Sequence, residues 1–183
     1  AGFLPRDHWT QDPVEGGGRI VGEACHFIDF VQYLTGALPV RVTATSVRSG
    51  NARETDADSV AISLAMSDGS VGSILYIAIG DKRLAKERCE VFADGSAAVL
   101  DDFKTATLYR GGREERLKGG AQDKGHAAEV AAFVEAVRTG APSPIALDSL
   151  VATTLASFAA VESLRTNAPV DLAEQLRSFG IKA

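Results

Sequence analysis

The residue best suited to acid–base chemistry in this sequence is His26. An imidazole, with an ordinary pKa of about 6.5, can accept or donate a proton at neutral pH. Glu23 precedes His26 by three residues, and residues three or four apart on a helix share a face. A carboxylate in that place can orient the imidazole and stabilise the imidazolium. The pair therefore predicts a proton-transfer site; the alternative is a histidine that only lies on a helix surface.

The spacing of apolar residues places this pair on a helix between Gly16 and Gly36. Apolar side chains recur there at helical intervals, which predicts a stripe that packs on a core. The stripe consists of Ile20, Ala24, Phe27, Ile28, Val31 and Leu34. The opposite face carries Arg19, Glu23, His26, Phe30 and Tyr33. Gly36 is typical of a helix end, where the chain turns left-handed.

Two patches of the sequence together carry the pattern of a known family. In the first, a glycine triplet opens the helix, two apolar residues and Asp29 follow His26, and Trp9 and Asp12-Pro13 precede. The second patch runs from Glu87 to Ser96. Over roughly residues 1 to 170, the chain resembles the C-terminal domain of the Gfo/Idh/MocA oxidoreductases, the family of glucose-fructose oxidoreductase and inositol 2-dehydrogenase. The segment before the helix is also similar to bacterial two-part proteins with an alcohol-dehydrogenase-like N-terminal half.

This resemblance implies roles for several residues. The family histidine that matches His26 transfers a proton to or from the substrate hydroxyl, and the positions that match Trp9 and Asp12 line the substrate pocket. Many members carry Asp one turn before that histidine, where this chain has Gly22. We expect Glu23 to substitute for it, because Glu has the longer reach.

Further substrate contacts are expected from basic residues. Arg19 lies on the same predicted helix face as His26. Lys82 and Arg88 fall in and after a charged loop that follows a predicted strand, where a cation can hold a carboxylate or phosphate of a substrate. The alternative for such a charge run is a solvated surface.

We expect this chain alone to bind no cofactor and no metal. Gly16, Gly18 and Gly22 lack the preceding buried strand and the following acidic strand end of a dinucleotide-binding turn. Cys25 and Cys89 are the two cysteines of the chain, too few for a disulfide framework or a thiolate metal site. The resemblance implies NAD or NADP on an N-terminal Rossmann domain that is missing from this chain, which by itself should be inactive.

Composition bounds the class of protein. The 183 residues are 45% hydrophobic and 23% charged, with a net charge of −5. An acidic chain without a basic patch is poorly suited to nucleic acid. We expect neither a membrane span nor a signal peptide, which indicates a cytoplasmic location.

The remaining pattern predicts an α+β fold. Residues 1–15 contain two prolines and no periodicity, which indicates an extended arm before one domain at 16–183. Alternating residues after Gly36 predict a strand, and hairpins follow around Asp68-Gly69, Asp94-Gly95 and Gly111-Gly112. Two helices come next, with Asp123 and Asp148 as expected caps. We expect one mostly antiparallel open sheet of about six to seven strands with helices on one face.

Two functions are consistent with the sequence. The first is the substrate-binding and oligomerisation domain of a nicotinamide-dependent oxidoreductase acting on a sugar, polyol or sugar derivative. The second is a non-catalytic binding or dimerisation module that keeps the fold. A homo-oligomer through the sheet face is expected in either case, because the strands near 60–66 and 71–79 carry apolar residues on both sides.

Overall fold

The computed structural model describes residues 4–5, 7–12, 14–47, 59–81 and 83–182. The chain divides into two compact units. Unit 1 comprises Ala1–Ile79 and Ile145–Ala183, and unit 2 comprises Gly80–Pro144.

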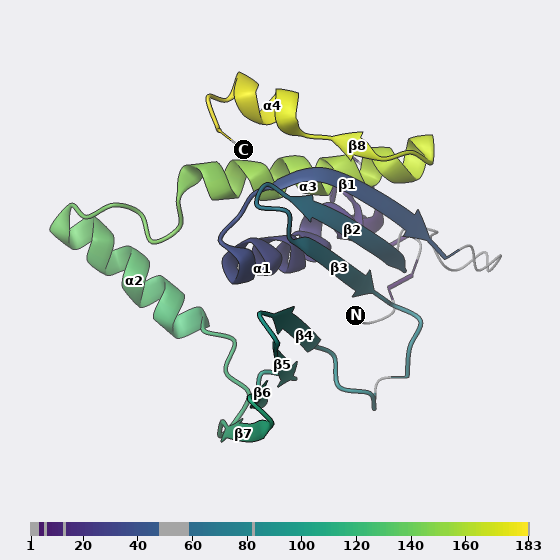
Figure 1. Ribbon diagram of the computed structural model, residues 1–183. Coiled ribbons are helices and arrows are strands. Elements are labelled where there is room, and N and C mark those ends of the chain that lie inside the picture. Colours follow the sequence, from purple (N-terminus) through teal and green to yellow (C-terminus); the bar gives the residue numbers. More distant parts are fainter. Residues whose placement is uncertain (1–3, 6, 13, 48–58, 82, 183) are drawn as a thin grey trace. The chain divides into compact units, whose positions relative to one another are not determined.

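Unit 1 is built on a four-stranded antiparallel sheet in the order β3-β2-β1-β8 (Figure 1). Its strands are β1 (Pro39–Ser46), β2 (Val60–Met66), β3 (Val71–Tyr76) and β8 (Val170–Asp171). The β2–β3 hairpin turns at Gly69, whose φ of 90° suits glycine, as its Asp68-Gly69 sequence predicts. Alternate residues of β2 are buried and exposed, so the sheet has one core face.

Two helices cover that core face. The helical elements of unit 1 are η1 (Trp9–Gln11), η2 (Ile20–Ala24), α1 (Cys25–Thr35), α3 (Leu147–Thr166) and α4 (Ala173–Ser178). Ile28 of α1 and Ala156 of α3 are both fully buried in one cluster with Leu64 of β2. The approach of α1 to the sheet is close, because a Cβ on Gly72 would lie 2.7 Å from Cγ1 of Val31. Helices on one face were expected, and unit 1 has this arrangement.

Helix α3 is long and apolar enough to cross a membrane by length and composition alone, a test that the core helix of a folded protein also passes. Its small residues are instead buried against the sheet: Ala152, Ala156, Ala159 and Ala160. Ser163 at its far end accepts a hydrogen bond from the backbone N–H of Ala44 at 2.9 Å. These contacts make α3 a core helix of unit 1.

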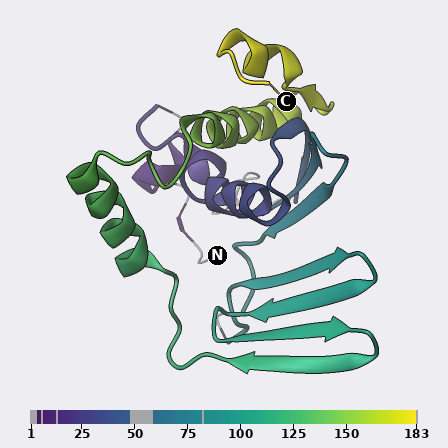
Figure 2. The same cartoon turned by 60° about the vertical axis from the view of Figure 1, so that its left-hand side comes forward.

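Unit 2 contains a four-stranded antiparallel meander and helix α2 (Figure 2). The elements are β4 (Arg88–Ala93), β5 (Ser96–Asp101), β6 (Thr105–Arg110), β7 (Arg113–Lys118) and α2 (His126–Thr139). Both hairpins predicted here are confirmed, with turns at Asp94-Gly95 and Gly111-Gly112. Gly140 ends α2 in the left-handed region, as predicted.

The α+β class is confirmed, but several details of the prediction were wrong. The strands form two four-stranded sheets rather than one. The two-residue strand β8 and the short helix α4 were missed, because neither is long enough to show a period. Asp148 lies inside the first turn of α3, whose N-cap is Ala146. Gly125 rather than Asp123 is the N-cap of α2, and Asp123 accepts the N–H of that glycine at 2.8 Å. The predicted division into an arm, 1–15, and one domain, 16–183, stays a prediction.

Candidate functional site

His26 lies near the start of α1, on the side of the helix away from the core. Its side chain is exposed, whereas Ile28, two residues on, is fully buried. Within the part of the chain that the structure describes, the imidazole makes no hydrogen bond. The exposed ring thus projects from a helix whose other side is fixed by the core.

A π-helical turn precedes α1 and changes which residues face the core. Residues Ile20–Ala24 form this turn, and the Cys25 N–H donates to the carbonyl of Ile20, five residues back. The wider turn shifts the helical period by one residue. The predicted exposed stripe is broken there: Arg19 is only 3% exposed, whereas His26 and Tyr33 remain on the surface.

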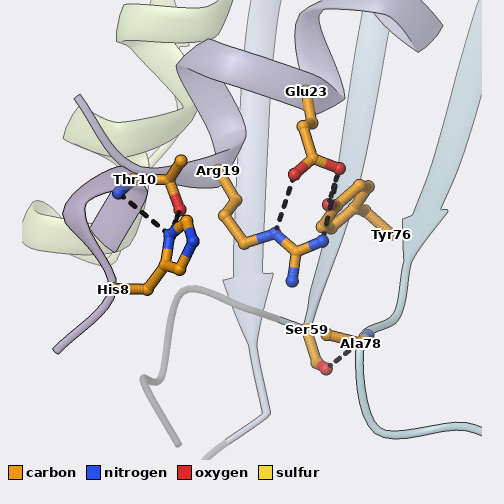
Figure 3. Close-up of polar contacts among 7 residues, drawn as sticks. All are labelled: His8, Thr10, Arg19, Glu23, Ser59, Tyr76 and Ala78. Carbon is orange, nitrogen blue, oxygen red and sulfur yellow. Dashed lines mark hydrogen bonds and ion pairs between the residues drawn. The ribbon is translucent and has the colours of Figure 1, made fainter. Parts of the chain in front are cut away.

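Arg19, Glu23 and Tyr76 form a polar network on the core side of this turn (Figure 3). The guanidinium of Arg19 donates to both carboxylate oxygens of Glu23, each at 3.2 Å. The hydroxyl of Tyr76 on β3 donates to Oε2 of Glu23 at 2.6 Å. The guanidinium carbon of Arg19 also lies 5.2 Å from the centre of the Tyr76 ring, within the range of a cation–π contact.

This environment shifts two pKa values in opposite directions. Burial, the largest influence, raises the pKa of Glu23, but the hydrogen bonds from Tyr76 and Arg19 and the Arg19 charge together lower it below its ordinary value. Burial, and then the hydrogen bond to Glu23, raise the pKa of Tyr76. The network therefore holds a carboxylate and a protonated phenol at neutral pH.

The expected pairing of Glu23 with His26 is not seen. Both Glu23 oxygens are directed at Arg19 and Tyr76, and the turn points them toward β3. Gly22, one turn before His26, is exposed, and a Cβ there would have only the Gly16 carbonyl oxygen near it, at 4.0 Å. The surface beside His26 therefore has no carboxylate at the position where many members of the resembling family carry Asp.

The arm residues occupy the turn that leads into this helix. Oδ1 of Asp12 accepts the backbone N–H groups of Val14 and Glu15, and these hydrogen bonds lower the Asp12 pKa. Asp12 thus organises the turn. Trp9 is 60% exposed and remains open to a ligand; the neighbouring His8 accepts the Thr10 backbone N–H at Nδ1 (Figure 3).

Two further substrate contacts, Arg88 and Lys82, were predicted in residues that belong to unit 2. Arg88 belongs to β4 in unit 2, where it is paired with Glu90 at 2.8 Å. Lys82 lies outside the described residues. Of the predicted candidates, the structure thus brings together Arg19 and Glu23. The structure adds Tyr76, which the sequence analysis missed. Its position on the buried face of a predicted strand could have indicated it, because a buried tyrosine hydroxyl needs a hydrogen-bond partner.

The cysteines and the glycine turn of the sequence have packing roles in the residues that the structure describes. Within the described ranges, no group of three or more His, Cys, Asp or Glu side chains could hold a metal ion. Cys25 and Cys89 are free and half-buried, and burial raises the pKa of both thiols. Gly16 permits close packing at the helix entry, since a Cβ there would lie 2.5 Å from Cα of Thr10.

Comparison with known proteins gives one family match and a set of structures with the same fold. A family model described as the GFO/IDH/MocA C-terminal domain matches residues 2–98. No curated protein matches the chain.

Three solved structures illustrate the shared fold. UDP-N-acetylglucosamine 3-dehydrogenase GnnA from Acidithiobacillus ferrooxidans has a TM-score of 0.70 at 22% identity, over 91% of this chain and 51% of that one. An aldose-aldose oxidoreductase from Caulobacter crescentus, complexed with glycerol, has a TM-score of 0.72 at 16% identity, over 93% of this chain and 52% of that one. An oxidoreductase from Agrobacterium radiobacter in complex with NAD+, L-tartaric acid and magnesium has a TM-score of 0.70 at 14% identity, over 84% of this chain and 48% of that one. At these identities the likeness shows the fold alone, and the chain spans about half the length of each structure.

Proposed function

Because the chain belongs to the GFO/IDH/MocA C-terminal domain family, we propose that it is the substrate-binding and oligomerisation domain of a nicotinamide-dependent oxidoreductase. The observation that carries this proposal is the exposed imidazole of His26 on a helix that the core holds in place. The solved structures with this fold include a UDP-N-acetylglucosamine dehydrogenase and an aldose-aldose oxidoreductase. A sugar, polyol or sugar derivative is therefore the proposed substrate class.

His26 would act on the hydroxyl group that is oxidised. In this reaction a secondary alcohol becomes a carbonyl: the carbon would lose a hydride to the oxidised nicotinamide, and the hydroxyl would lose a proton, which His26 would accept. Imidazole is suited to this because it exchanges a proton near neutral pH. Trp9, which is 60% exposed, would pack on the apolar C–H face of a sugar ring.

The nicotinamide cofactor would be held by a different domain of the complete protein. Gly16 packs closely on the backbone of Thr10, so this glycine is explained by the helix entry. The solved structures with this fold are about twice as long as this chain, which leaves room for a cofactor domain. We therefore expect the chain alone to bind NAD or NADP weakly and to be inactive.

The outer face of the unit 1 sheet is the proposed surface for self-association. Val71, Leu75 and Ile79 are 71%, 76% and 49% exposed on or just beyond β3. A solvated antiparallel face normally carries polar residues, and a large exposed apolar patch usually marks an interface. Two-fold pairing of like sheets is the simplest closed arrangement.

One observation favours a second function, a non-catalytic binding or dimerisation module. Gly22 has no side chain one turn before His26, and Glu23 is committed to Arg19 and Tyr76. Without a carboxylate at that position the imidazolium has one stabilising influence fewer.

Turnover of the complete protein separates these functions. The substrates to test are UDP-N-acetylhexosamines, free aldoses and inositols with NAD+ or NADP+, with reduced nicotinamide absorbance as the readout. If His26 transfers the proton, His26→Ala lowers kcat about 100- to 10,000-fold and leaves the unfolding midpoint almost unchanged, because the side chain is exposed. Asp7→Ala, at another exposed site, serves as a control. Wild-type turnover in His26→Ala would refute the catalytic role, and absence of turnover with every substrate would favour the binding module.

A further inference from the structure

The π-helical turn before α1 is tied together by an ion pair on its inner side. Such turns are rare and are frequently found at functional sites. Arg19 stands at the start of the turn and Glu23 within it, so their two hydrogen bonds of 3.2 Å span the widened backbone. On the outer side, Gly22 has no side chain to contribute. The hydrogen bonds from Arg19 and Tyr76 to Glu23 thus brace the turn on the side that faces β3.

Tyr76 links this braced turn to the sheet. Its hydroxyl donates to Glu23 at 2.6 Å and its ring lies under the Arg19 guanidinium. The same ring is 6.4 Å, centre to centre, from that of Phe27, the residue next to His26. One side chain thus contacts the start of the turn, its middle and the first turn of α1.

The strand that carries Tyr76 is itself well fixed. Tyr76 is 4% exposed and pairs with Val60 of β2. Just beyond it, the Ala78 N–H donates to the buried hydroxyl of Ser59 at 3.1 Å (Figure 3). The tyrosine is therefore a fixed point against which a less regular turn can be held.

We propose that Tyr76 is a positioning residue for His26, acting through Glu23 and the π-helical turn. Helix α1 begins at Cys25, directly after the turn. One residue more or less in a helical turn rotates the segments on either side of it by about 100° relative to each other. The link from Tyr76 thus sets the direction in which His26 projects relative to the arm that carries Trp9. The catalytic part of this proposal rests on the proposed function, in which His26 touches the substrate.

The first experiment uses NMR of this chain and needs no substrate. Tyr76→Phe removes the hydroxyl but keeps the ring beneath Arg19. We expect the Cys25 amide, which is bonded to the Ile20 carbonyl, to exchange at least about tenfold faster, as one lost charge-assisted hydrogen bond allows, and the imidazole signals of His26 to move. Glu23→Gln, which weakens the same link from its other end, should move the same signals. The matched control is Tyr33→Phe, at a tyrosine 81% exposed on α1, which should change neither. Unchanged Cys25 exchange and His26 signals in Tyr76→Phe would overturn the proposal.

The second experiment measures turnover of the complete protein. Tyr76→Phe should lower kcat about 10- to 100-fold, since a misplacement of about 1 Å can cost this much, with little change in KM. A wild-type kcat in Tyr76→Phe, while His26→Ala is inactive, would overturn the positioning role and leave the proposed function intact. A wild-type kcat in His26→Ala would instead refute the proposed function. The NMR experiment would then still test whether Tyr76 positions the His26 side chain through Glu23 and the turn.

Discussion

Ser163 provides a test of how α3 is fastened to the sheet. Its hydroxyl accepts the backbone N–H of Ala44 at 2.9 Å, and the two residues are 0% and 4% exposed. Strand β8, which pairs with β1 only at Arg41 and Val42, does not extend as far as Ala44. The side chain from α3 therefore satisfies a buried donor that β8 does not reach.

Ser163→Ala removes the acceptor and leaves the buried N–H without this partner. Such a loss costs about 1–3 kcal/mol. For a chain of this size, each kcal/mol lowers the melting temperature by roughly 2–4 °C, so we expect a decrease of about 2–12 °C. The assay is thermal and urea unfolding followed by circular dichroism, with the midpoint compared at equal m-value.

Ser157→Ala is the matched control, because it makes the same change at an equally buried position of the same helix. Ser157 is 1% exposed, but its hydroxyl donates to the carbonyl of Thr154 in its own helix, at 2.8 Å. Alanine is the better helix former, so the free energy of unfolding should change by less than about 0.5 kcal/mol. Equal losses in the two variants, or no loss in Ser163→Ala, would refute the reasoning.

Two other predictions concern the two faces of the sheet. On the core face, Gly72→Ala places a Cβ about 2.7 Å from Val31 and should destabilise unit 1 by about 1–3 kcal/mol. Adding Val31→Ala should recover part of that loss in a double-mutant cycle, whereas additive losses would show that the contact is not the cause. On the outer face, Leu75→Lys should convert the homo-oligomer to a monomer in light scattering, with the fold retained. Val14→Lys, at a residue 91% exposed, should not do so. A wild-type chain that is already monomeric would contradict the proposed interface.

Much of the fold was readable in the sequence because it depends on contacts between near neighbours in the chain. The hairpins at Asp68-Gly69, Asp94-Gly95 and Gly111-Gly112 follow from turn residues that accept positive φ. The ends of α1 and α2 at Gly36 and Gly140 follow from the same freedom. How these hairpins group into two sheets was not readable, because alternation gives the faces of a strand but not its neighbours beyond the hairpin.

The residues of the candidate site also fall into those that the sequence indicated and those that only the structure brought together. The sequence by itself indicated His26, its exposed position and its resemblance to a known proton-transfer residue. It wrongly placed Arg19 on the exposed face, because a regular period of 3.6 residues was assumed through Ile20–Ala24. The π-helical turn brings Arg19 and Glu23 to a tyrosine hydroxyl that lies 53 residues after Glu23 in the chain. Only tertiary packing could decide this, because the guanidinium, the carboxylate and the phenol satisfy one another only once β3 and the helix have come together.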